Sequence, residues 1–294
     1  MASARFETRR LTSDAMFVVC AACTLLIVTL LLLVSGYLVW IGIGSIDMSF
    51  FRDVPTGDVA TPGGMRHAIE GTVILLALAA AVGVPLGVAA GVYLSEYSHE
   101  WFFAGPLRFI ADVLTGVPSI VVGILGYELF VVPVSRWTSN SVSFSGYAGA
   151  AALAFIMIPI VARTTEEMLR LVPKTYREGS LALGASKAQT VLRVVLPSAF
   201  GSISTGIMLA LARVAGETAP LLFTALGSRL LTRDPSEPFP SLTLQIYTYA
   251  TGPYPEQKKL AWAGILVLLA LLFAVNLLIR VVAARHAATR LGKV

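Results

Sequence analysis

Charged residues are scarce in this chain, and that scarcity indicates the class of protein. Asp, Glu, Lys and Arg make up 13% of the 294 residues, whereas soluble domains typically carry about 25%. Hydrophobic residues make up 56%, and the mean hydropathy is +0.78. The formal charge of +5 does not indicate a nucleic-acid partner, because the basic residues flank apolar runs instead of clustering with aromatic residues. The composition therefore predicts an all-α membrane protein that is surrounded by lipid and does not bind nucleic acid.

Cysteine and the common catalytic motifs are also missing. Cys20 and Cys23 are the only cysteines, and both lie in the first apolar run, which excludes a disulfide framework and a cysteine-based zinc site. The three histidines lie far apart in the sequence, so no metal site is expected. The chain has no G-x-x-x-x-G-K-[ST], H-E-x-x-H or G-x-S-x-G motif. The sequence therefore predicts that this chain does not hydrolyse ATP, and that any energy it uses comes from a partner.

Six apolar runs are present, each longer than the roughly 18 residues expected of a membrane span. The expected spans are residues 15–44, 71–94, 109–133, 137–162, 194–228 and 260–279. The first run has 30 residues, whereas the apolar region of a signal peptide has about 7–15, so we expect this span to be retained. The five later spans are expected to form a core over residues 71–283.

Basic residues predict the orientation of these spans. With the N-terminus inside, fourteen of the 22 Lys and Arg residues fall in inner segments and seven in outer loops. Because basic residues are enriched on the cytoplasmic side, both termini are expected in the cytoplasm. The expected inner segments are the tails 1–14 and 284–294 and a loop at 171–197. The expected periplasmic loops are 45–70 and 229–259.

Some helix contacts can be predicted from small and charged residues. Gly83, Gly87 and Gly91 recur every four residues in the second span, a pattern that lets helix backbones approach closely. Asp112 lies near the cytoplasmic border of the third span, where we expect it to cap a helix or pair with Arg108.

An arginine and a glutamate, Arg213 and Glu217, interrupt the fifth span. An ionisable side chain at membrane depth costs at least about 2.5–3.5 kcal/mol on insertion scales, so it usually has a function. On a continuous helix Gly206, Ala210, Arg213 and Glu217 would share one stripe, with the charged residues one turn apart. We therefore expect the charged pair to face protein or a cavity and not lipid.

The chemistry of Arg213 suits an oxyanion. Its planar guanidinium stays ionised and can bind such an anion through two parallel hydrogen bonds, whereas a buried lysine can lose its charge. Glu217 cannot bind an anion, and we expect it to hold Arg213 in place or moderate its charge. Gly216 and Pro220 would loosen the helix beside Glu217 and free backbone carbonyls to line a pathway. A purely structural pair of Arg213 and Glu217 remains the alternative.

The inner segment from 176 to 197 predicts a second functional element. It is polar and helix-forming, and Gly184 interrupts it, which favours two short helices meeting at a glycine turn. Such an element would lie at the membrane surface and offer a protrusion to a soluble partner. An ordinary connecting loop is the alternative.

This segment resembles the coupling motif of the binding-protein-dependent ABC importer permeases. That motif reads Glu-Ala-Ala, three residues, Gly, nine residues, Ile-x-Leu-Pro. The residues at the matching positions, which the resemblance implies couple to an ATPase, are Glu178, Gly179, Ser180, Gly184, Val194, Leu196 and Pro197. The chain departs from the motif in having Gly179 and Ser180 for the two alanines and Val194 for the isoleucine.

Other segments resemble the PstA family of phosphate-importer permeases. They include Tyr93-Leu-Ser-Glu-Tyr97, residues 112–120, the run Arg213-Val-Ala-Gly-Glu-Thr-Ala-Pro-Leu-Leu-Phe-Thr, and residues 241–247. The resemblance extends over about residues 62–283. It implies a type I ABC importer permease fold with a cytoplasmic coupling-helix loop, in the cytoplasmic membrane of a bacterium, and the translocation of inorganic phosphate.

The resemblance also implies partners. These are a second, PstC-like permease, two PstB-like ATPase subunits that bind ATP and Mg, and a periplasmic PstS-like phosphate-binding protein. No cofactor is expected on this chain. The family places a functional arginine at Arg163, although an arginine extending to the inner headgroups would explain that position equally well. Two other functions stay open: a permease for another oxyanion such as sulfate or molybdate, and a stand-alone secondary carrier or intramembrane enzyme.

Overall fold

The protein is a bundle of long helices. The computed structural model describes residues 2–58, 62–98, 104–138 and 143–291. Within these ranges no strand forms, and six helical segments are long and apolar enough to cross a membrane. They are Arg9–Ile43, Arg66–Tyr97, Ser119–Trp137, Gly146–Arg170, Lys187–Ala215 and Pro255–Val281. The predicted all-α, six-span architecture is confirmed.

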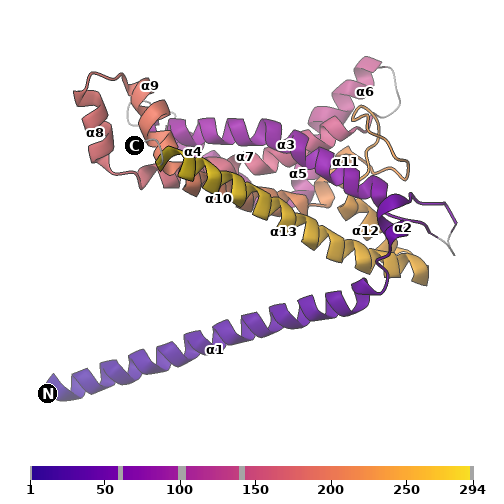
Figure 1. Ribbon diagram of the computed structural model, residues 1–294, viewed down its shortest axis with the longest axis horizontal. Coiled ribbons are helices and arrows are strands. Elements are labelled where there is room, and N and C mark those ends of the chain that lie inside the picture. Colours follow the sequence, from indigo (N-terminus) through magenta and orange to yellow (C-terminus); the bar gives the residue numbers. More distant parts are fainter. Residues whose placement is uncertain (1, 59–61, 99–103, 139–142, 292–294) are drawn as a thin grey trace.

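The helices follow one another in the order shown in Figure 1. Their bounds are α1 Ala2–Ile43, α2 Met48–Arg52, α3 Arg66–Val92, α4 Ala104–Gly116, α5 Ser119–Gly126, α6 Val132–Thr138, α7 Gly146–Arg170, α8 Lys174–Ala182, α9 Lys187–Thr190, α10 Leu196–Ala215, α11 Ala219–Thr224, α12 Leu242–Thr251 and α13 Pro255–Leu291. Short π-helical turns, Tyr93–Tyr97, Tyr127–Val131 and Val191–Val195, follow α3, α5 and α9.

Helix α7 is the centre of the bundle. In its apolar window 67% of residues are buried, compared with 0–39% in the other five spans. Added Cβ atoms at Gly83, Gly87 and Gly91 of α3 would lie 3.1 Å, 2.7 Å and 2.5 Å from side-chain atoms of Met157, Val161 and Thr165 in α7. The predicted close approach is therefore confirmed, and the partner is α7.

Replacing Gly87 with alanine should destabilise the protein by about 1–3 kcal/mol, because the added methyl group overpacks the contact with Val161. The measurement is the free energy of unfolding of the purified protein in detergent. Gly36→Ala in α1 is the matched control, because nothing lies within 4 Å of its added Cβ. Equal stability of the two variants would contradict the packing argument.

Three expected span boundaries are wrong. The expected span 109–133 is two helices, since the chain breaks at Val117 and Pro118 between α4 and α5, and Pro118 has no N–H to continue α4.

The expected span 137–162 begins and ends later, because the Ser145 side chain caps α7 by accepting a hydrogen bond from the Ala148 N–H, and α7 continues to Arg170. The expected span 194–228 is helical from Lys187, but it ends at Ala215.

Helices α1 and α13 run past the expected limits of the first and last spans. The expected loop 45–70, the polar start of the expected fourth span and the tail 284–294 each include residues outside the described ranges. Helix α1 diverges from the bundle. The C-terminal end of α1 meets α13, near the start of α13 (Figure 1). There Tyr37 packs edge-on against Trp262, with ring centroids 5.7 Å apart.

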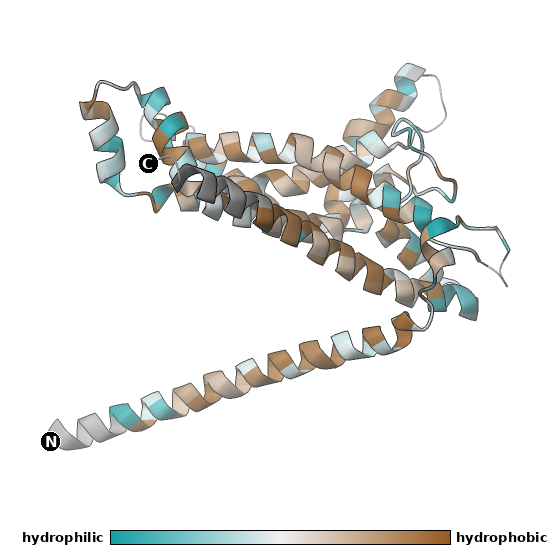
Figure 2. Ribbon diagram, viewed as in Figure 1, coloured by the Kyte–Doolittle hydropathy of each residue, from teal (hydrophilic) through white to brown (hydrophobic). Residues whose placement is uncertain are grey.

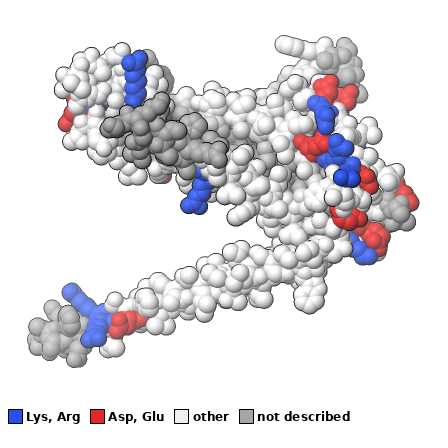
Figure 3. Space-filling model, viewed as in Figure 1, with Lys and Arg blue, Asp and Glu red and all other residues white. Residues whose placement is uncertain are grey.

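The two ends of the bundle differ from its middle. Apolar residues run along the long helices, and the charged side chains visible in this view gather mostly at the ends (Figures 2 and 3). Helices α8 and α9 lie at the end toward which the start of α1 and the end of α13 point, and α2, α6 and α12 lie at the opposite end (Figure 1). Both termini therefore point to the α8–α9 end of a multi-pass membrane protein.

Candidate functional site

Arg213 lies in the last turn of α10, and its side chain is exposed. One face of α10 is buried on α7: Ala210 is fully buried, and an added Cβ at Gly206 would clash with the Thr164 hydroxyl. The opposite face is exposed and includes Ser202 and Thr205. Gly206 and Ala210 therefore pack inside the bundle, whereas Arg213 extends from it beside an uncovered polar face.

Glu217 does not lie on a helical face with Arg213, so the predicted one-turn spacing is wrong. Helix α10 ends where the Gly216 N–H donates to the Arg213 carbonyl, and α11 begins with Pro220 in its first turn. Glu217 is half-buried in the break, where the Thr243 hydroxyl of α12 donates to its backbone carbonyl at 3.1 Å. Among the described side chains no ion pair joins Glu217 to Arg213. The predicted weakening of the helix by Gly216 and Pro220 is confirmed.

Arg163 lies inside α7, almost two turns before its end, within a group of carboxylates. Its Nε donates to Glu167 Oε1 at 2.9 Å, and its Nη1 lies 3.8 Å from Glu166 Oε2 and 3.9 Å from Asp112 Oδ1. The structure therefore brings Asp112 to Arg163 and not to Arg108, which corrects the expected pairing. The positive charge of Arg163 is balanced by these neighbours.

Glu166 is the main site residue that the sequence reasoning missed. Its side chain is 1% exposed, and its Oε1 accepts hydrogen bonds from Arg108 Nε at 2.7 Å and from Arg170 Nη2. Arg108 also donates to the Leu94 carbonyl and the Ser98 hydroxyl, so the cluster joins α4, α7 and the end of α3. The four-residue spacing of Glu166 and Arg170 was a visible signal, but Arg108 is 58 residues from Glu166 in sequence.

Glu166→Gln should destabilise the protein by about 2–4 kcal/mol, because Arg108 and Arg170 would keep their charges and lose the buried carboxylate. The expected loss is discounted for the partial exposure of both arginines. Glu167→Gln is the matched control, since its pair with Arg163 is exposed and should contribute less than about 1 kcal/mol. Unfolding in detergent measures both variants, and a similar small loss in each would contradict the role of Glu166.

The segment after α7 forms two short helices joined by a glycine turn, as predicted. Gly184 has φ +84°, a left-handed conformation that disfavours other residues, and its N–H donates to the Leu181 carbonyl at 2.9 Å. Ser186 then caps α9 in a reciprocal pair with Gln189. Helix α8 has no buried residue, and Leu183 at its end is 90% exposed. The segment is an exposed protrusion.

Arg177 anchors this protrusion to the bundle. Its Nη2 and Nε donate to Glu96 Oε1 at 2.6 Å and Oε2 at 3.1 Å, and it also donates to the carbonyls of Leu169 and Val172. Such a two-point arginine–carboxylate pair has a defined geometry. Glu96 lies in the π-helical turn that follows α3, 81 residues before Arg177 in the sequence. A displacement of α8 would therefore be transmitted to α3.

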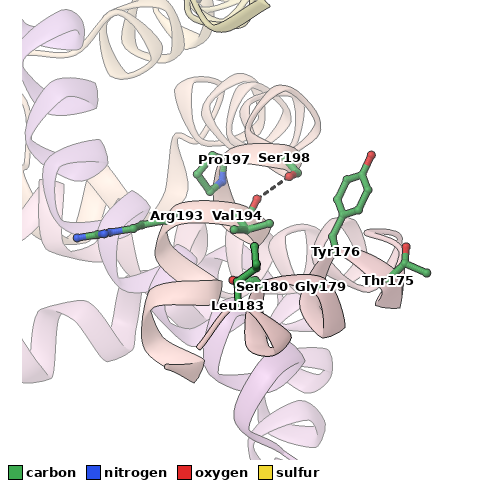
Figure 4. Close-up of a pocket in the computed structure, with 9 residues that line it drawn as sticks. All are labelled: Thr175, Tyr176, Gly179, Ser180, Leu183, Arg193, Val194, Pro197 and Ser198. Atoms are coloured by element: carbon green, nitrogen blue, oxygen red, sulfur yellow. Dashed lines mark hydrogen bonds between the residues drawn. The ribbon is translucent and has the colours of Figure 1, made fainter. Parts of the chain in front are cut away.

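A groove of 660 Å³ lies between α8 and the start of α10. In Figure 4, Thr175, Tyr176 and Gly179 lie on one side of it, and Val194 and Pro197 lie on the other. Glu178 and Gly179 are exposed, Ser180 bonds the Thr190 hydroxyl at 2.9 Å, and Leu196 is partly buried. The motif residues therefore divide into an exposed part on α8 and a supporting part at the start of α10.

Comparison with known proteins identifies the family. Residues 83–287 match the family described as binding-protein-dependent transport system inner membrane component. The chain is 40% identical over 256 residues to the phosphate transport system permease protein PstA of Yersinia pestis, covering 85% of this chain and 84% of that protein. The chain belongs to the PstA family of these permeases.

A second relative agrees with this assignment. The permease is 40% identical over 219 residues to the probable phosphate transport system permease protein PstA of Methanocaldococcus jannaschii, covering 74% of this chain and 75% of that protein.

Solved structures support the permease fold. A bacterial alginate ABC transporter in complex with a pentasaccharide-bound periplasmic protein gives a TM-score of 0.57 at 15% identity, covering 89% of this chain and 91% of that chain. The inward-facing MetNI methionine ABC transporter gives 0.53 at 21% identity, covering 75% of this chain and 94% of that chain. At these identities the likeness shows the fold alone.

Proposed function

We propose that this permease is one of two membrane subunits of an ATP-driven ABC importer that moves inorganic phosphate across the cytoplasmic membrane, and that Arg213 binds phosphate transiently on the way. The observation that carries the proposal is the exposed guanidinium of Arg213 in a membrane-spanning helix, with no carboxylate in ion-pair contact among the described side chains. The names of the relatives at 40% identity support phosphate as the cargo.

The exposed face of α10 supports a path between two permeases. Ser202, Thr205 and Arg213 lie on a surface that nothing in the described part of the chain covers. A polar face at membrane depth is costly against lipid, so a second, PstC-like permease is the proposed cover. Phosphate would pass between the two subunits as a monoanion or dianion, and the guanidinium fork would bind its oxygens for a short time.

The roles of Glu217 and Arg163 follow from their positions. Glu217 lies in the break between α10 and α11, four residues after Arg213. There its half-buried carboxylate would repel phosphate and help the ion to leave the arginine. Arg163 would be reached later, and its carboxylate neighbours Glu167 and Asp112 would compete with phosphate there. Weak binding at successive sites is what transport needs, since a tightly held ion does not move on.

The protrusion of α8 is the proposed contact for the motor. The contact with a PstB-like ATPase, one of two that bind ATP and Mg, would be made by Glu178, Gly179 and Ser180. Gly184 would set the turn after α8. Leu196 and Pro197, at the start of α10, would support α8. This chain would then need no cofactor of its own and hydrolyse no ATP. The α8–α9 end is accordingly proposed to be cytoplasmic, with both termini, and the loop 229–259 to face a PstS-like phosphate-binding protein in the periplasm.

Uptake by the reconstituted importer tests the proposal. Proteoliposomes with ATP inside and the binding protein outside should take up radiolabelled phosphate, and an excess of sulfate or molybdate should not compete. Preferential uptake of sulfate or molybdate would instead support the other oxyanion function. Phosphate uptake without the ATPase subunits would support a stand-alone carrier and contradict the proposal.

A further inference from the structure

A small polar cavity lies at the end of the bundle opposite α8 and α9. It has a volume of 160 Å³ and lies between the end of α11, the following turn and α12. Its polar lining residues are Ser228, Arg229, Ser241, Gln245 and Thr248. Sites for drug-sized ligands measure roughly 300–1,000 Å³, so this cavity suits one small ion with a few waters.

Arg229 is the one charged residue in the lining of this cavity. Among the described side chains its guanidinium has no carboxylate within ion-pair distance. Arg233, four residues later on the same loop, is different: its Nη2 lies 2.9 Å from Glu70 Oε2. Burial raises the pKa of the nearby Tyr249 hydroxyl, and the Gln245 amide and then the positive charge of Arg229 act in the opposite direction. The cavity therefore has a net positive charge that its own residues do not balance.

Unused hydrogen-bond donors surround this charge. Gln245 is 7% exposed, and its Nε2 has no acceptor among the described residues. In the described part of the chain the N–H group of Ser228 also has no acceptor, and the two residues before it, Leu226 and Gly227, adopt left-handed conformations with φ of 61° and 82°. A buried donor without a partner costs about 1–3 kcal/mol, and a free backbone N–H group in such a turn can donate to an anion. A cation beside free donors is the chemistry of an oxyanion site.

Helix α12 lies beside both the cavity and the break that follows Arg213. Gln245 and Ser241 flank Thr243 on α12, and the Thr243 hydroxyl donates to the backbone carbonyl of Glu217 in the break after α10. One short helix thus borders both the cavity and the segment that follows Arg213. We infer that this cavity binds inorganic phosphate through Arg229, Gln245 and the free Ser228 N–H group before the ion reaches Arg213. The inference rests on the proposed function in phosphate import.

Uptake of radiolabelled phosphate by the complete reconstituted importer tests the site. At phosphate well below saturation Arg229→Gln should lower uptake about tenfold, because charge-assisted hydrogen bonds to the anion are lost. Arg229→Lys should keep part of the activity. Arg233→Gln is the matched control, since Arg233 pairs with Glu70 and is not part of the cavity lining, so its loss should change uptake less than about twofold.

Gln245→Met separates a binding role of Gln245 from a structural role, because stability and uptake are both measured. Removing a buried amide without an acceptor should leave the free energy of unfolding unchanged or higher, while uptake falls severalfold. A variant that loses stability and uptake together would indicate that Gln245 only supports the fold, and would remove it from the site.

The outcomes separate this site from the proposed function. Normal uptake by Arg229→Gln would overturn the site and leave phosphate import intact. Loss of the stimulation of ATP hydrolysis by the binding protein in Arg229→Gln would mean that Arg229 docks that protein, which would also overturn the site. Absence of phosphate uptake by the wild-type importer would reject the proposed function and this site with it.

Discussion

Arg213→Ala should lower phosphate uptake at least about 100-fold, because two charge-assisted hydrogen bonds, each worth roughly 1.5–3 kcal/mol, would be lost on the proposed path. Arg213→Lys should also be impaired, since an ammonium does not reproduce the planar fork. The side chain is exposed at the end of α10, so neither change should affect folding or assembly with the ATPase. The measurement is ATP-dependent phosphate uptake by the complete importer, with co-purification of the ATPase as the control for assembly.

Glu217 supplies the comparison for this experiment. Glu217→Gln should reduce uptake less than Arg213→Ala, because its carboxylate is proposed to assist release and not to bind. Exchanging the two residues, Arg213→Glu with Glu217→Arg, should not restore uptake, since the structure has no ion pair between them to re-form. Restored uptake in the exchange variant, or normal uptake by a correctly inserted Arg213→Ala protein, would show that Arg213 is not a phosphate ligand.

Gly184→Val should uncouple the permease and lower ATP-driven uptake at least about tenfold, while leaving the bundle folded. Gly184 has φ +84°, and an L residue pays roughly 1–2 kcal/mol for a left-handed conformation, more when it is β-branched. Nothing lies within 4 Å of an added Cβ, so the effect arises from backbone conformation and not from a clash. The turn would relax and move the exposed end of α8 away from its docking position.

Gly179→Ala is the matched control for Gly184→Val. Gly179 lies within α8 with nothing near its added Cβ, and alanine favours a helix. Alanine is also the residue of the family's coupling motif at this position, so it should be tolerated at the ATPase contact and uptake should be unchanged. Disulfide crosslinking between a cysteine in place of Glu178 and one on the ATPase surface, with Cys20 and Cys23 replaced by serine, reports docking directly. The crosslink should form in the parent protein and weaken in Gly184→Val. Efficient crosslinking near Glu96 or the C-terminal tail, and none at Glu178, would place the coupling contact elsewhere.

Features that depend on a few neighbouring residues could be predicted from the sequence. Long apolar runs identified six spans because a helix needs a fixed number of apolar residues to cross a bilayer. Gly184 predicted the turn between α8 and α9 because only local backbone conformation is involved. Gly83, Gly87 and Gly91 predicted a close contact, although their spacing did not identify α7 as the partner.

The positions of helix breaks were predicted less well, since several residues compete to end a helix. Gly216 and Pro220 indicated a weak point in the fifth span, but Arg213 and Glu217 were still placed on one continuous helix. The Gly216 N–H instead closes α10 on the Arg213 carbonyl, and Pro220 starts α11, so four residues no longer amount to one helical turn. Pro118 divides α4 from α5 in the same way.

The sequence by itself determined the six spans, the exposed two-helix protrusion and a permanent cation in the fifth span. Only the tertiary structure decided which charges meet. Glu166 binds Arg108 across 58 residues, Glu96 binds Arg177 across 81, and Arg229 stays unpaired while Arg233 takes Glu70. The physical reason is that helix formation follows from hydrogen bonds and periodicity within a turn or two, whereas an ion pair needs two side chains that packing alone brings together.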